Sequence, residues 1–204
     1  MRTTSRSSER SIARPTRSPV AELLGALGAV LGRLGVGWYL FEAQAALLYG
    51  AARLTADVDV TVDLGARPIS ELIAALTEGG FAVRTRDDLD DFVARTRVVP
   101  LVHAASGVPV DIVLGGPGPE QLFLARARRH VIDGVPVPVA GPEDVVAMKL
   151  LAGRGKDIDD ALAILAANPA LDAGLVRSTL ATFEAALDRS DLVRPFEDLL
   201  RRSR

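Results

Sequence analysis

Polar and apolar residues alternate strictly over residues 57–64, which is the pattern of a β-strand with one apolar face. Asp57, Asp59, Thr61 and Asp63 share the polar side, and the residues between them are valine or leucine. Two further apolar segments lie on either side of an Ala-Ser-Gly turn and predict a hairpin. The predicted strands cover residues 38–41, 57–64, 81–84, 98–103 and 108–114, with two more in 130–139 around an Asp-Gly turn.

Between these strands, apolar residues recur at helical spacing. The predicted helices cover residues 21–34, 42–48, 68–76, 119–129, 142–152, 157–167, 171–187 and 190–203, with a partly helical segment in 85–94. No strand is predicted after residue 139, so we expect an α/β (α+β) protein in which a sheet core precedes a helical section.

Three regions follow from this pattern. Residues 1–19 are rich in Arg and Ser with almost no apolar residues, and we expect a disordered tail. Residues 20–140 form the predicted α/β core. Residues 141–204 form the predicted C-terminal helical region, packed on that core.

Composition excludes several classes of function. The chain has no cysteine, which excludes disulfides, thiolate metal sites and a cysteine nucleophile. The apolar runs are too short for a transmembrane helix and no signal peptide is recognised, so we expect a cytoplasmic protein without a membrane partner. The net charge is −2, but residues 1–19 carry five Arg and one Glu, which leaves −6 on the remainder. This acidic body argues against a broad nucleic-acid-binding surface.

Asp57 and Asp59 are the first candidates for chemistry. Residues i and i+2 of a strand point to the same side, so their carboxylates lie a few ångströms apart. Carboxylates held this close repel each other unless one is protonated or a cation lies between them. Mg²⁺ suits such a site, because it binds one or two carboxylates together with substrate phosphates. The same pattern also fits a solvated strand face, which Asp63 continues.

A third carboxylate, Asp111, lies in the apolar segment 108–114. It is the only charged residue between Arg97 and Glu120. An isolated acid in an apolar strand is costly unless it is paired or bound to a metal. Three carboxylates on adjacent strands could hold two Mg²⁺ ions at a site for phosphoryl displacement.

Other polar residues are weaker candidates for a functional site. His103 and His130 lie beside apolar strands without a second ligand at zinc spacing, so we expect structural roles for both. Arg95 and Arg97 precede the strand at 98–103, and we consider them as additional contacts to phosphate.

The acidic residues belong to a longer pattern of three segments. The first reads Gln44-Ala45-x4-Gly50-x2-Arg53-x-Thr55-x-Asp57-Val58-Asp59, the second is Val110-Asp111, and the third, residues 143–160, reads EDVVAMKLLAGRGKDIDD. In this order they resemble the nucleotidyltransferase superfamily of DNA polymerase β type. The closest similarity is to the AbiEii/AbiGii-like toxin nucleotidyltransferases of bacterial abortive-infection and toxin–antitoxin systems. The resemblance covers roughly residues 35–165.

This resemblance implies a nucleotidyltransferase-type mixed sheet and a Mg²⁺-dependent enzyme that moves a nucleoside monophosphate from an NTP to an acceptor hydroxyl. Asp57, Asp59 and Asp111 would be its catalytic and metal-binding residues, with Asp111 either completing the metal site or accepting the proton of the attacking hydroxyl. The implied nucleotide-binding residues are Gln44, Arg53, Thr55, Lys149 and Arg154. The implied partners are an NTP, a tRNA or other RNA acceptor, and a cognate antitoxin.

The residues of the third segment also fit a structural role. Lys149 can belong to an amphipathic helix, and Arg154 and Asp157 can tie two neighbouring helices together.

One position departs from the family. Gly-Gly or Gly-Ser usually begins the helix that approaches the triphosphate, and this chain has Glu42-Ala43 there. Glycine lets backbone N–H groups come close to phosphates, whereas a glutamate repels them unless it turns away or binds metal. The alternative hypothesis is therefore a catalytically silent nucleotide- or partner-binding module of the same fold. A small molecule or a protein hydroxyl are the alternatives to an RNA acceptor.

Overall fold

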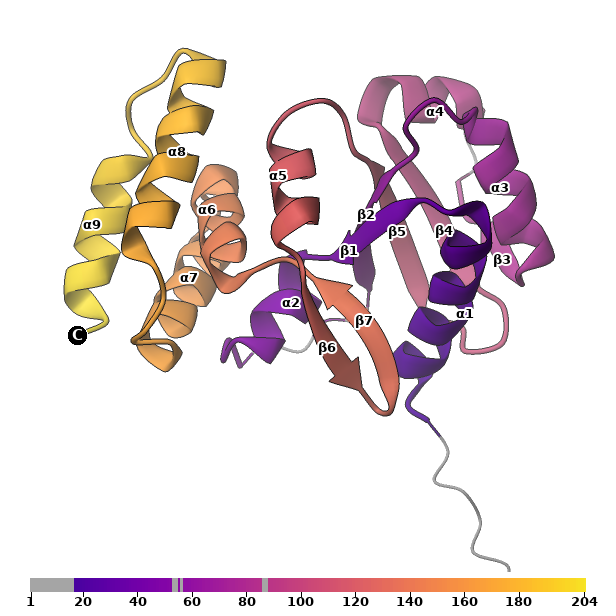
Figure 1. The fold of residues 1–204 in the computed structure, drawn as a ribbon, viewed down its shortest axis with the longest axis horizontal. Coiled ribbons are helices and arrows are strands. Elements are labelled where there is room, and N and C mark those ends of the chain that lie inside the picture. Colours follow the sequence, from indigo (N-terminus) through magenta and orange to yellow (C-terminus); the bar gives the residue numbers. More distant parts are fainter. Residues whose placement is uncertain (1–16, 53–54, 56, 86–87) are drawn as a thin grey trace, which may run out of the picture.

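The computed structural model describes residues 17–52, 55, 57–85 and 88–204 (Figure 1). Its strands are β1 (Gly37–Leu40), β2 (Val58–Asp63), β3 (Phe81–Val83), β4 (Val98–His103), β5 (Pro109–Leu114), β6 (Arg128–Ile132) and β7 (Val135–Val139). Its helices are α1 (Pro19–Leu34), α2 (Glu42–Leu48), α3 (Ile69–Glu78), α4 (Leu89–Thr96), α5 (Pro119–Arg126), α6 (Pro142–Ala152), α7 (Gly155–Ala167), α8 (Ala173–Leu187) and α9 (Val193–Arg202). The predicted fold class, a mixed sheet core followed by helices, is confirmed.

The strands form a single mixed sheet in the order β3-β4-β5-β2-β1-β7-β6. Most neighbours are antiparallel, but β2 runs parallel to β5 and β1 runs parallel to β7. The parallel pairs join segments that are far apart in the sequence. In this order β2 lies at the centre of the sheet, between β1 and β5. This arrangement brings the two acidic strands of the sequence analysis side by side.

The apolar face of β2 is fully covered. Val58, Val60 and Val62 are all buried in the core, as their alternation predicts. The opposite face is partly covered too, because Thr61 is only 4% exposed. The polar side of the strand is therefore not the solvated face that its sequence also allowed.

One predicted helix is too long. Residues 119–129 were expected to be helical, but α5 ends at Arg126 and the chain turns extended at Ala127. Arg128 and Arg129 instead begin β6, where they pair with Val139 and Pro138 of β7. Pairing across the Asp133-Gly134 turn outweighs the local helical pattern at these arginines.

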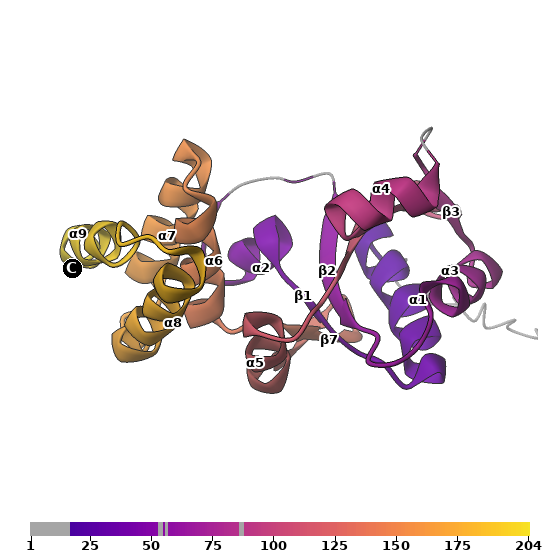
Figure 2. The ribbon, with the colours of Figure 1, turned by 90° about the horizontal axis from the view of Figure 1, so that it is seen from above.

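The C-terminal helices α6–α9 gather at one end of the molecule, and α1 and α3 lie at the other (Figures 1 and 2). Helix α2 lies between the sheet and the C-terminal helices, where it contacts β2, α6 and α7. Among the described helices, none combines the length and the apolar character needed to cross a membrane.

Candidate active site

Three predicted acids come together at the amino-terminal ends of β2 and β5. Asp59 of β2 is paired in register with Asp111 of β5. Residues in register on parallel strands face the same side, so the two carboxylates share one face of the sheet. Asp57 directly precedes β2 and is exposed, and the Thr55 hydroxyl donates a hydrogen bond to its carboxylate. The two acids of the i, i+2 pair, Asp57 and Asp59, and the separate third acid, Asp111, thus lie in one region of the structure.

Asp111 has a partner that the sequence did not suggest. Arg84, just after β3, donates from its Nη2 to Asp111 Oδ1 and from its Nε to the carbonyl of Leu101, at 3.2 Å. The guanidinium thereby reaches across β4 to β5. Arg97, which was considered for a phosphate contact, instead donates to the carbonyls of Leu114 and Gly115 at the other end of β5.

Asp59 lies in an unfavourable place for a negative charge. Burial, followed by the nearby carboxylates of Asp57, Glu42 and Asp111, raises its pKa from 3.8 to about 7, and Lys149 opposes this only in part. A carboxylate in such surroundings is stabilised by a cation. Across the described ranges, however, no three Asp, Glu or His side chains are placed to hold a metal ion as they stand.

Glu42 forms the border of this acidic region. The backbone N–H of Phe41 donates to the carbonyl of Asp59 at 3.1 Å, which extends the β1–β2 pairing to the end of β1. Helix α2 begins at the next residue, Glu42. The end of β1 therefore carries Glu42 to the side of Asp59. Gln44, a predicted nucleotide-binding residue, lies two positions further on in α2 and is half-buried.

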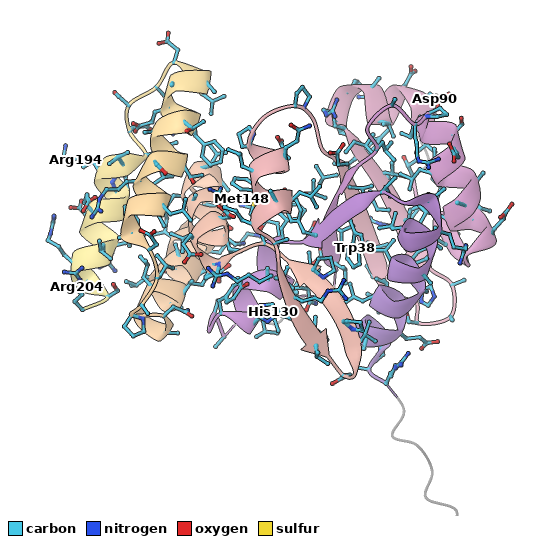
Figure 3. All side chains as sticks on the ribbon, in the orientation of Figure 1. Trp38, Asp90, His130, Met148, Arg194 and Arg204 are labelled. Carbon is cyan, nitrogen blue, oxygen red and sulfur yellow. The ribbon has the colours of Figure 1, made fainter. Side chains whose placement is uncertain are left out.

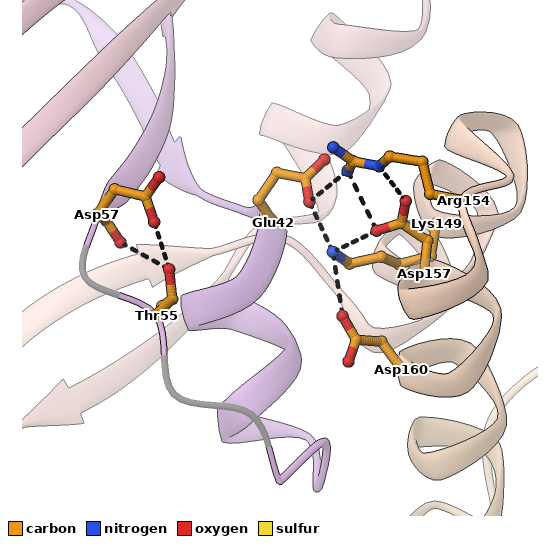
Figure 4. A network of polar contacts seen from close by, with 7 residues as sticks. All are labelled: Glu42, Thr55, Asp57, Lys149, Arg154, Asp157 and Asp160. Atoms are coloured by element: carbon orange, nitrogen blue, oxygen red, sulfur yellow. Dashed lines mark hydrogen bonds and ion pairs between the residues drawn. The ribbon is translucent and has the colours of Figure 1, made fainter.

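Lys149 lies behind Glu42 in α6 and is only 1% exposed. Its Nζ is 2.6 Å from Glu42 Oε2, 3.1 Å from Asp157 Oδ1 and 3.3 Å from Asp160 Oδ2 (Figure 4). Burial alone would lower the pKa of Lys149, but its bonds to Glu42 and Asp157 outweigh burial and raise it. The ammonium therefore stays charged and joins three carboxylates from α2 and α7.

Arg154 lies between α6 and α7, next to this ammonium. It donates to both carboxylate oxygens of Asp157, and its Nη2 is 3.7 Å from Glu42 Oε2. Burial alone would raise the pKa of Asp157, but the bonds from Arg154 and Lys149 hold it below its usual value. The Arg154 side chain is 53% exposed, so it is the accessible cation of the network.

The remaining predicted residues are placed as follows. Arg53 lies outside the described residues. His103 Nδ1 is 2.8 Å from the Ser106 hydroxyl in the β4–β5 turn. His130 lies on β6 (Figure 3). Its Nε2 is 3.1 Å from the hydroxyl of Tyr49, the residue after α2. Both histidines therefore make contacts within the fold, as their expected structural roles require.

Comparison with known proteins identifies a family whose sequence pattern matches most of the chain. The family described as "Nucleotidyl transferase AbiEii toxin, Type IV TA system" matches residues 46–203. This range contains Asp57, Asp59, Asp111 and the α6–α7 segment, whereas Glu42 and Gln44 precede it. No curated protein matches the chain.

Solved structures share the fold at low sequence identity. An antigenic nucleotidyltransferase-like protein from Paracoccidioides brasiliensis has a TM-score of 0.54 at 19% identity, over 88% of this chain and 92% of that chain. The antibiotic-resistance factor ANT(2'')-Ia in solution gives 0.55 at 19% identity, over 83% and 93%. The crystal structure of ANT(2")-Ia in complex with adenylyl-2"-tobramycin gives 0.56 at 18% identity, over 83% and 99%. At these identities the likeness shows a common fold.

Proposed function

The chain belongs to the AbiEii nucleotidyltransferase toxin family, and from this premise we propose that it is a Mg²⁺-dependent enzyme that transfers a nucleoside monophosphate from an NTP to an acceptor hydroxyl. The observation that carries the proposal is the register of Asp59 with Asp111, beside Asp57, on two parallel strands. These are the acids that the family resemblance selects.

The donor set of the site fits Mg²⁺. Oxygen ligands are the ones that Mg²⁺ prefers, and Asp57, Asp59 and Asp111 offer only carboxylate oxygens. Among the described residues, six carboxylates of the site face three cations. The carboxylates are Glu42, Asp57, Asp59, Asp111, Asp157 and Asp160, and the cations are Arg84, Lys149 and Arg154. When bound, Mg²⁺ would offset this surplus and the charge of the phosphate oxygens.

The protein residues position the reactants. In our proposal Asp57 and Asp59 hold the metal, and Asp111 either completes its ligands or accepts the proton of the acceptor hydroxyl. The acceptor oxygen forms a bond to the α-phosphorus as the bond to the bridging oxygen breaks, and pyrophosphate leaves with that electron pair. Positioning and electrostatics supply most of the catalysis in such displacements.

Arg154 is the leading candidate for contact with the triphosphate, because it is half-exposed beside the acidic region. A planar guanidinium offers two parallel N–H groups to a phosphate. We propose that Gln44, Arg53, Thr55 and Lys149 complete the nucleotide site.

The antitoxin and the acceptor are the remaining parts of the proposal. A toxin of a type IV toxin–antitoxin system implies a cognate antitoxin, and we propose a tRNA or another RNA as the acceptor. A second candidate acceptor is a cationic small molecule. It is favoured by the −6 charge of residues 20–204 and by the shared fold with ANT(2")-Ia, a structure in complex with adenylyl-2"-tobramycin.

Thermal unfolding with Mg²⁺ and each NTP tests the nucleotide site. Binding to the folded state raises its stability by mass action, by about 2.7 kcal/mol when the ligand is at a hundred times its Kd. We expect a rise in Tm with Mg²⁺ and one or more NTPs, and its loss in Asp57→Ala. Asp63→Ala, at the far end of β2 and on the same side of the strand as Asp59, is the matched control and should keep the rise. No rise with any nucleotide would favour a silent module.

A further inference from the structure

Glu42 has a backbone conformation that residues other than glycine rarely adopt. Its φ is +54°, in the left-handed region. For a residue with a Cβ this conformation is strained, so surrounding contacts must hold it. The contacts of its carboxylate supply that restraint.

The Glu42 carboxylate lies in front of two cations. Its Oε2 is 2.6 Å from Lys149 Nζ and 3.7 Å from Arg154 Nη2, and its side chain is 24% exposed. Figure 4 shows Glu42 on the side of Lys149 and Arg154 that faces Asp57. A ligand that approaches these cations from the acidic region therefore meets Glu42 first.

The ammonium of Lys149 donates hydrogen bonds to Glu42 and Asp157 and forms an ion pair with Asp160. It carries three N–H groups, and three carboxylates surround it. Two of them, Asp157 and Asp160, come from α7 and are almost fully buried. Glu42 is the partly exposed one, so it is the partner that a ligand can displace.

We propose that the Glu42 carboxylate occupies the position of a nucleotide phosphate in front of Lys149 and Arg154, which makes Glu42 a specificity-determining residue of this site. The inference rests on the proposed function. Two anions cannot share this position without repulsion, so a phosphate enters only when Glu42 leaves. Glu42 then lies closer to Asp57 and Asp59, where its charge adds to theirs. Phosphate binding is therefore weak unless a divalent cation accompanies it.

The accessibility of Lys149 tests the proposal directly. The chain has only two lysines, Lys149 and the exposed Lys156, so methylation with ¹³C-formaldehyde and a borane reductant labels two ε-amines that NMR can distinguish from each other. We expect Lys149 of the wild type to react at least about tenfold more slowly than Lys156, because only its open state reacts. In Glu42→Gln, Lys149 should react at least about fivefold faster than in the wild type, and Mg²⁺ with inorganic tripolyphosphate should restore its protection.

Affinity for tripolyphosphate is the second measurement. Calorimetry in the presence of Mg²⁺ should show about tenfold tighter binding to Glu42→Gln, because a competing charge-assisted bond to Lys149 is removed. Glu42→Gly should bind tripolyphosphate as tightly as Glu42→Gln does. It replaces the glutamine variant if that variant fails to fold, since glycine accepts a φ of +54°. Glu71→Gln, which removes an exposed pair with Arg67, is the control and should match the wild type.

Unchanged or weaker tripolyphosphate binding in both Glu42 variants would overturn the inference, as would unchanged protection of Lys149. If the wild type still shows its Mg²⁺–NTP stabilisation, lost in Asp57→Ala, the proposed function survives that result. If neither NTPs nor tripolyphosphate bind to any variant, both proposals fail.

Discussion

Lys149 is the residue at which the fold and the candidate site are joined. Its ammonium is buried and contacts one carboxylate from α2 and two from α7. A buried ion pair adds little net stability, but removing one partner leaves charges without compensation. Here three carboxylates would lose their common partner.

Lys149→Met should therefore lower the free energy of unfolding by about 3–5 kcal/mol. Lys156→Met, at the exposed lysine seven residues along the chain, should change it by no more than about 0.5 kcal/mol. Urea titrations of the two variants measure the difference. Equal stabilities would mean that Lys149 does not compensate these carboxylates.

At the scale of residues, local sequence patterns located the acids but not their partners. Strand alternation and an isolated acid in an apolar segment were enough to select Asp57, Asp59 and Asp111. Arg84 is separated from Asp111 by 27 positions, and Lys149 from Glu42 by 107. No period or motif within one segment encodes such pairs, because they depend on how strands and helices assemble. The structural role considered for Arg154 and Asp157 agrees with their contacts.

At the scale of elements, most helices and strands could be predicted to within a few residues, because each has its own period of apolar positions. The order of the strands in the sheet could not be predicted in this way. The parallel pairs β2–β5 and β1–β7 join segments far apart in the chain, and local pattern says which face is apolar but not which strand lies beside it. The site depends on these pairings.

The contact between α2 and α7 gives a prediction at this scale. Gly50 follows α2 with a φ of +107°, and a Cβ there would lie 2.5 Å from the Cβ of Ala167 at the end of α7. Gly50→Ala should cost about 2–4 kcal/mol, from the strained φ and from overpacking. Gly65→Ala, with a φ of +56° and open space around it, should cost only about 1 kcal/mol. Equal losses of unfolding free energy in urea would show that α2 and α7 do not pack closely here.

The junction between α5 and α6 should make stability depend on pH. Asp144 of α6 is 1% exposed, and burial raises its pKa from 3.8 to about 6 although Arg126 donates to it at 2.6 Å. A group whose pKa is higher in the folded state stabilises that state at low pH, and the contribution is lost as the pH rises through about 6.

Relative to Asp144→Asn, the wild type should therefore lose about 2 kcal/mol of unfolding free energy between pH 4.5 and pH 7.5. Urea titrations at several pH values give the difference between the two proteins. A difference that does not change with pH would show that Asp144 titrates at its ordinary pKa.

At the scale of the whole molecule, the candidate site lies where the sheet core meets the C-terminal helices. The core supplies Asp57, Asp59 and Asp111, and residues 141–204 supply Lys149 and Arg154. The predicted boundary at residue 140 falls between β7 and α6, so both predicted regions contribute to one site.

The central claim is that these acids catalyse metal-dependent nucleotide transfer, and label transfer from α-³²P-labelled NTPs tests it most directly. The protein is incubated with Mg²⁺ and each NTP, with total bacterial tRNA or with an aminoglycoside, beside Asp57→Ala/Asp59→Ala and the Asp63→Ala control. We predict label on the RNA, reduced at least about a thousandfold in the double variant, because removal of the metal-binding carboxylates forfeits several kcal/mol of transition-state stabilisation. Label on the aminoglycoside or on the protein itself would keep the chemistry and change the acceptor. Equal label from the double variant, or no label on any acceptor from the wild type, would contradict the claim.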